Sequence, residues 1–147
     1  MNIHLPALGT LIVLATIVGC GSGSISPPRT VPVRGAVLMN GQPVAGVVVR
    51  FHPQFDIGKV KFIPSAETDA KGEFTLNTGA PGNGAPVGDY VVTFEKPRII
   101  SDTANSGIET EVDEFEGRYG DPEKSEWKIT IENAVIEIEP FELGDPS

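Results

Sequence analysis

The chain has 147 residues, a formal net charge of −9 at pH 7 and a single cysteine, Cys20. Its acidic balance argues against nucleic acid and against electrostatic docking onto anionic lipid, because both carry negative charge. The 17 glycines and 13 prolines lie between short runs rich in Val, Ile, Thr and Phe. With no heptad pattern and no repeat of fixed period, the chain is expected to form one all-β domain.

The N-terminus carries an uncharged apolar stretch, residues 5–18, that leads into Ile17-Val18-Gly19-Cys20. The stretch is shorter than the ~20 apolar residues that a transmembrane helix needs, and no Lys or Arg cluster follows it. Small residues flank Cys20 on both sides. This arrangement resembles the lipobox of bacterial lipoproteins, in which a peptidase cuts just before the cysteine and lipid is attached to it.

The lipobox resemblance implies an anchored protein. Residues 1–19 are then a signal peptide, and Cys20 is the lipidation site that makes the bilayer a partner. Residues 20–30, rich in Gly, Ser and Pro, are expected to form a flexible tether. The alternatives are an ordinary secretory signal or a weak membrane anchor, since Met1-Asn2-Ile3-His4 carries no Lys or Arg. In lipoproteins of well-studied two-membrane bacteria, an aspartate after the cysteine often marks retention in the inner membrane. Gly21 stands there in this chain, so by analogy we expect the outer membrane of the cell envelope.

The first two expected strands show the alternation of half-buried β-structure. In residues 31–39 the apolar positions share one face, and Asn40-Gly41 follows as the preferred pair for a type I′ hairpin turn. In residues 44–52 the odd-numbered apolar positions point inward. His52 points outward on the opposite face.

The later elements repeat this pattern with turns between them. The expected strands lie at residues 66–69, 73–77, 88–94, 127–131 and 134–141. Residues 79–88 are expected to form a Gly/Pro loop, and residues 97–120 an irregular acidic insertion. We therefore predict an antiparallel β-sandwich of seven strands, transthyretin-like or immunoglobulin-like, over residues 31–142, with a tail at 143–147.

Four short motifs follow one another along this domain. They are Val33-Arg34-Gly35-Ala36-Val37 with Asn40-Gly41-Gln42-Pro43-Val44-Ala45-Gly46, then Thr68-Asp69-Ala70-Lys71-Gly72-Glu73-Phe74, then Pro86-Val87-Gly88-Asp89-Tyr90-Val91-Val92, and finally Arg118-Tyr119-Gly120-Asp121-Pro122-Glu123-Lys124-Ser125. Together they resemble carboxypeptidase regulatory-like domains, which are transthyretin-like sandwiches without catalytic activity of their own. Short lipoproteins of planctomycete-like bacteria carry such domains. The resemblance implies no defined biochemical activity.

The residues of these motifs have structural explanations. Gly72 and Gly88 suit positions that need a positive φ or close approach of another group. Tyr90 resembles a tyrosine corner, with its ring in the core and its hydroxyl bonded to nearby backbone. Asn40 and Gly41 suit the hairpin turn.

Catalytic and metal-binding chemistry find little support in the sequence. His52 is the only histidine after residue 19, so a zinc site with several His or Cys ligands is not available. There is no Gly-x-Ser-x-Gly elbow, and the chain does not end in the Tyr-Arg-Gly-Ser of transthyretin-like hydroxyisourate hydrolases. We expect no catalytic residue, no metal and no cofactor, and we interpret His52 as an exposed strand residue.

Two functions remain open. The first is a membrane-anchored, non-catalytic sandwich that binds a protein or glycan of the cell envelope. The alternative is a weak hydrolase or carbohydrate-binding domain that uses loop carboxylates. The acidic run at residues 109–116 lacks the residue order of a calcium loop, and whether it binds Ca²⁺ stays open.

Overall fold

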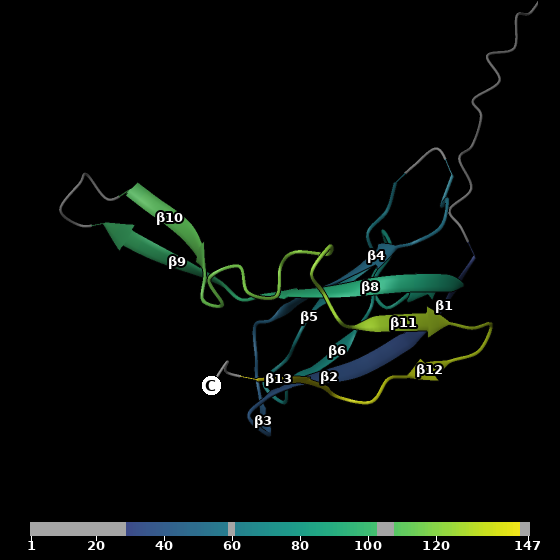
Figure 1. Cartoon of the computed structure of the whole chain (residues 1–147), viewed down its shortest axis with the longest axis horizontal. Helices are drawn as coiled ribbons and strands as arrows, with labels where there is room; N and C mark the ends of the chain where they lie inside the picture. Colours follow the sequence, from purple (N-terminus) through teal and green to yellow (C-terminus); the bar gives the residue numbers. More distant parts are fainter. Residues whose placement is uncertain (1–28, 59–60, 103–107, 145–147) are drawn as a thin grey trace, which may run out of the picture.

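The computed structural model describes residues 29–58, 61–102 and 108–144, and in these the regular elements are all β-strands (Figure 1). In chain order the strands are β1 (Thr30–Val31), β2 (Val33–Met39), β3 (Gln42–Pro43), β4 (Val48–Pro53), β5 (Ser65–Glu67), β6 (Glu73–Thr75), β7 (Ala85–Pro86), β8 (Gly88–Glu95), β9 (Pro97–Asp102), β10 (Ile108–Asp113), β11 (Lys128–Ile131), β12 (Ile136–Glu137) and β13 (Phe141–Leu143). The described part of the chain has no helix with the length and hydropathy of a membrane span.

Two sheets pack face to face. One is four-stranded with the order β11-β8-β4-β5, and the other is five-stranded, with β2 at its centre and β3, β6, β12 and β13 around it. Two small two-stranded sheets, β1-β7 and β10-β9, accompany them. The prediction of an all-β sandwich is confirmed.

An aromatic cluster fills the space between the sheets. Phe51 of β4 lies 5.8 Å from Tyr90 of β8 and 6.4 Å from Phe141 of β13, measured between ring centroids. Phe141 also lies 5.1 Å from Phe94 of β8. Because Phe141 belongs to one sheet and its partners to the other, these edge-on contacts join the two layers.

The inward faces match the alternation in the sequence. On β2, Val33 and Val37 are fully buried, and on β4 Val49 and Phe51 are fully buried. Val47, just before β4, is also fully buried. These side chains are the core positions expected from the period of two.

The sheet around β2 is not wholly antiparallel, which corrects the predicted topology. Both β12 and β13 run parallel to β2, whereas β3 and β6 pair with it antiparallel. Several strands are also shorter than expected, and the described residues contain more strands than the seven predicted. Strand direction depends on how distant segments meet, and the alternation pattern carries no information about it.

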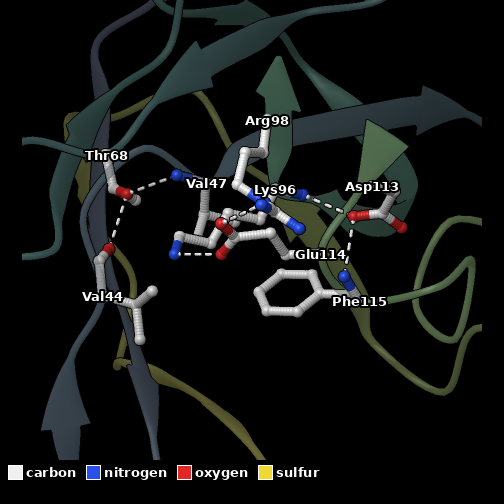
Figure 2. Close-up of polar contacts among 8 residues, drawn as sticks. All are labelled: Val44, Val47, Thr68, Lys96, Arg98, Asp113, Glu114 and Phe115. Carbon is white, nitrogen blue, oxygen red and sulfur yellow. Dashed lines mark hydrogen bonds and ion pairs between the residues drawn. The ribbon is translucent and has the colours of Figure 1, made fainter. Parts of the chain in front are cut away.

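The expected strand at residues 44–52 is interrupted, and this is a second correction. Pairing stops after Pro43 and resumes at Val48, with Gly46 at φ 73° between them. Thr68 holds the gap: Val47 N donates to its hydroxyl at 2.9 Å, and the hydroxyl donates to Val44 O at 2.6 Å (Figure 2). The chain thereby passes from the β2 sheet to the β4 sheet, so one strand cannot cover this stretch.

Two boundaries near the C-terminal half also change. Residues 97–120 were expected to be irregular, yet β9 and β10 pair along their whole length, from Pro97 opposite Asp113 to Asp102 opposite Ile108. The tail was expected to begin at residue 143, but Leu143 is fully buried in β13. A core residue therefore lies where the sequence suggested the domain had ended.

Candidate binding surfaces

The β9–β10 hairpin, residues 97–102 and 108–113, projects away from the sandwich (Figure 1). Among the described strands, β9 pairs only with β10, and β10 only with β9. Ile99 is 63% exposed and Ile100 41% exposed, which are large values for isoleucine in a strand. Glu109 and Glu111 on β10 are exposed as well. The hairpin therefore combines two open sheet edges with exposed apolar and acidic side chains.

The register places unlike side chains together on each face of the hairpin. Ile99 lies opposite Glu111, and Ser101 lies opposite Glu109, so one face mixes an apolar group with two carboxylates. Ile100 lies opposite Thr110 on the other face. Neither face is purely apolar, and this explains why the sequence showed no alternation of hydrophobicity here.

Asp113 ties the base of the hairpin to the domain (Figure 2). One of its carboxylate oxygens accepts hydrogen bonds from Lys96 N at 2.8 Å and Phe115 N at 3.0 Å, and the other accepts from Gly117 N at 2.9 Å. Partial burial of Asp113 opposes ionisation, but these three backbone donors, helped by Arg118, hold its pKa below the usual value.

Charged and aromatic contacts reinforce this base. Glu114 forms an ion pair with Lys96, and its Oε1 lies 3.3 Å from Arg98 Nε. The next residue, Phe115, is 4% exposed and packs edge-on against Tyr119 with ring centroids 5.3 Å apart. The hairpin is thus fastened at one end, while its residues 97–101 and 109–111 are exposed.

A groove on the β2 sheet is the second surface feature. It has a volume of about 650 Å³. In the sheet, Arg34 of β2 pairs with Thr75 of β6 on one side and with Glu137 of β12 on the other. Glu67, Glu73 and Asp69 also line the groove, although Asp69 already accepts backbone hydrogen bonds from the turn that follows it.

His52 belongs to a polar cluster on the outer face of β4 and β8. Its Nε2 lies 2.8 Å from the hydroxyl of Thr93, which is 1% exposed, and Arg50 forms an ion pair with Glu95 beside them. Burial, followed by the positive charge of Arg50, lowers the pKa of His52, and Glu95 partly opposes this shift. His52 does point outward, but its interpretation as an exposed residue is wrong, because the ring is half-buried and bonded.

The structure places Tyr90 and Gly88 together at the start of β8. The Tyr90 hydroxyl donates to Pro86 O at 2.8 Å, and its ring is 1% exposed. A Cβ on Gly88 would lie 2.2 Å from the ring of Phe55, which itself packs edge-on against Tyr90 at 5.4 Å. These residues act in packing.

The other residues singled out from the sequence lie in turns or outside the described ranges. Asn40 and Gly41 have φ values of 52° and 76°, as a type I′ turn requires. Gly72 has φ 73° and lies against the backbone of Val37. Cys20 lies outside the described residues.

The acidic run at residues 109–116 does not converge. Glu109 and Glu111 lie on the hairpin, Asp113 accepts backbone hydrogen bonds, and Glu114 pairs with cations at the base. Across the described ranges, no three or more His, Cys, Asp or Glu side chains are placed to hold one metal ion.

The sequence did not identify the exposed Ile99 and Ile100 or the Asp113 that holds the base of the hairpin. Ile99 and Ile100 stand in a stretch without hydrophobic period, and nothing in the sequence marks them as exposed. Asp113 offered one usable signal. Aspartate side chains in turns often accept a hydrogen bond from the backbone N–H two residues on, and Gly117, with φ 75°, suits the turn that follows.

Comparison with known proteins assigns no family. No family model matches the chain, and no curated protein matches it. Among solved structures, a 9R-lipoxygenase from Cyanothece PCC8801 aligns over 78% of this chain at 14% identity with a TM-score of 0.41, and the chain spans 16% of that protein. A Pseudomonas aeruginosa protein provisionally described as carbohydrate-binding aligns over 82% of this chain and 91% of its own, at 11% identity and a TM-score of 0.41.

Proposed function

We propose that this chain is a lipid-anchored, non-catalytic binding module of the bacterial cell envelope, and that its β9–β10 hairpin contacts a protein partner. The observation that carries the proposal is the hairpin itself, which leaves the sandwich with both edges open and two isoleucines exposed. An isolated two-stranded hairpin is marginally stable in water, and proteins usually protect such edges. Strand addition to an exposed edge is a common mode of protein recognition.

The base of the hairpin supports this role. Asp113 fixes the backbone of Lys96, Phe115 and Gly117, and Phe115 packs into the domain. The projecting strands therefore start from a fixed position, which lowers the entropic cost of binding. The resemblance to carboxypeptidase regulatory-like domains is part of the same proposal, since such domains have no catalytic activity of their own.

The binding role is tested by removing the hairpin. Residues 98–112 are replaced by Asn-Gly, so that Pro97 and Asp113 remain to close the base. We expect the shortened protein to keep the thermal unfolding of the core but to lose the envelope proteins that the full chain captures from detergent extracts. Unchanged capture would assign binding to another surface.

The anchor is tested separately at Cys20. Cys20→Ala is expected to release the protein from the membrane fraction, because a lipidated cysteine with more than one acyl chain is a durable anchor. Membranes washed with salt and separated on a density gradient check both parts of the proposal. A mutant that stays in the pellet contradicts lipid anchoring, and recovery of the wild type with inner-membrane markers alone contradicts the outer-membrane location.

The groove on the β2 sheet supports a second candidate, a carbohydrate-binding or weakly hydrolytic surface. It brings Glu73 and Glu137 to the same hollow as Arg34, and glycosidases work with pairs of carboxyl groups. Glu73→Gln combined with Glu137→Gln is the test, with Glu109→Gln on the hairpin as control. Loss of binding or hydrolysis of envelope polysaccharides in the double mutant only would favour this candidate over the hairpin.

A further inference from the structure

The hydrogen bonds at the base of the hairpin determine which backbone groups face outward. Glu114 N donates to Lys96 O at 2.8 Å, and these two residues lie opposite each other one step before the pair Pro97 and Asp113. Hydrogen-bonded and non-hydrogen-bonded pairs alternate along an antiparallel ladder. The Ile99–Glu111 and Ser101–Glu109 pairs are therefore non-hydrogen-bonded.

The two edges consequently offer different side chains beside their free backbone groups. On β9, the N–H and C=O groups of Ile99 and Ser101 point away from β10. On β10, the outward groups belong to Glu109 and Glu111. Residues 99–101 carry no charge, and Ile99 and Ile100 are exposed there, whereas the β10 edge has two carboxylates of the kind that discourages pairing.

We propose that β9 of one copy pairs antiparallel with β9 of a second copy, with the two Ile100 residues opposite each other. This proposal rests on the proposed function and names the second copy as a partner of the same hairpin. In this register Ile99 of each copy forms a hydrogen-bonded pair with Ser101 of the other, so the outward groups of these residues are satisfied. Pro97, which has no N–H to donate, is not part of these pairs.

The charges of the hairpin favour this pairing over its alternative. Across the four strands, one row of side chains is Thr110, Ile100, Ile100 of the second copy and Thr110 of the second copy, without a charge. Pairing through β10 would instead place Glu109 opposite Glu111, and like charges directly opposite are destabilising. Anchoring both copies to one bilayer raises their effective concentration, which offsets the mutual repulsion of two chains of charge −9.

Cysteine cross-linking of the full chain in membranes tests the register. Opposed residues at a non-hydrogen-bonded site have Cα atoms about 4.5 Å apart, within the ~4.4–6.8 Å of a disulfide. Ile100→Cys should therefore give a disulfide-linked dimer under mild oxidation. Thr110→Cys and Arg98→Cys should not, because in this arrangement each lies about 14 Å from its counterpart. The wild type controls for Cys20.

A pair of proline variants tests the edge. Ser101 and Glu109 lie opposite each other, and the N–H of each points outward, so Ser101→Pro and Glu109→Pro make matched changes on the two edges. Each is combined with Ile100→Cys. We expect Ser101→Pro to abolish the cross-link and Glu109→Pro to leave it intact, with the thermal unfolding of both variants reported as the folding control.

The outcomes separate this inference from the function on which it rests. Equal cross-linking of Thr110→Cys, or loss of the dimer with Glu109→Pro alone, overturns pairing through β9. If Ile100→Cys gives no dimer while removal of residues 98–112 still abolishes capture of a different protein, the second copy is excluded and the hairpin remains a binding element for that protein. If neither has an effect, the proposed function fails as well.

Discussion

Replacement of Tyr90 measures how a single buried hydroxyl and ring contribute to the sandwich. The hydroxyl donates to Pro86 O at 2.8 Å, and the ring lies 5.8 Å from Phe51 and 5.4 Å from Phe55. Tyr90→Phe keeps these ring contacts and loses one hydrogen bond, so the free energy of unfolding should fall by ~1 kcal/mol. Tyr90→Ala opens a cavity in the core and should lower it by ~3–5 kcal/mol.

Urea denaturation of the three proteins checks these magnitudes, and pH provides a second test. Burial raises the pKa of Tyr90. Since the folded state then holds the proton more tightly than the unfolded state, the stability from the neutral phenol is complete below pH ~10 and declines as the pH rises above it. The difference between wild type and Tyr90→Phe should therefore narrow at alkaline pH. A Tyr90→Phe protein as unstable as Tyr90→Ala would refute this explanation.

Three further changes have defined outcomes. His52→Ala should lower the free energy of unfolding by ~1 kcal/mol, because the buried Thr93 hydroxyl loses its partner. Since the pKa of His52 is lowered in the folded state, the stability of the wild type should also decline as the pH falls below 6.5. Urea melts in which the mutant shows the same decline would contradict this. Gly72→Ala should lower the melting temperature more than Gly41→Ala. A Cβ at position 72 would lie 2.7 Å from the backbone oxygen of Val37, whereas a Cβ at position 41 would have no atom within 4 Å. Equal losses would mean that the positive φ alone, and not the contact, determines the cost. Asp113→Asn should speed hydrogen exchange of the backbone amides in the hairpin at neutral pH. The difference between mutant and wild type should disappear at acidic pH, where the wild-type carboxylate becomes protonated below its lowered pKa. Unchanged exchange at neutral pH would show that other contacts hold the base of the hairpin.

The inward faces of the sandwich were predictable because they depend on local period. Val33 and Val37 share one face of β2, Val49 and Phe51 share one face of β4, and all four are fully buried. A strand with one face in the core must follow this period, since a shift of one residue would turn its apolar side chains outward. The turn at Asn40 was predictable for the same kind of reason, because few residues tolerate positive φ.

The hairpin was not predictable in this way. Its strands are held by backbone hydrogen bonds to each other and by Asp113 at the base, and the side chains of residues 97–101 and 109–111 are exposed. Without burial there is no selection for alternating hydrophobicity, so Ile99 and Ile100 stand beside each other among polar residues. The hydrophobic pattern therefore predicted an irregular acidic segment, although β9 and β10 pair regularly there.

Features that depend on neighbouring residues were predictable from the sequence, and features that depend on distant contacts were not. The amino-acid order alone specifies the class of fold, the inward faces of the main strands and the turn at Asn40, because these depend on side chains within a few residues of one another. The parallel pairing of β12 and β13 with β2, the burial of Leu143 and the half-buried site of His52 were decided only by the tertiary structure. Each depends on segments far apart in the chain that meet during folding, and local sequence contains no record of which segment its neighbour will be.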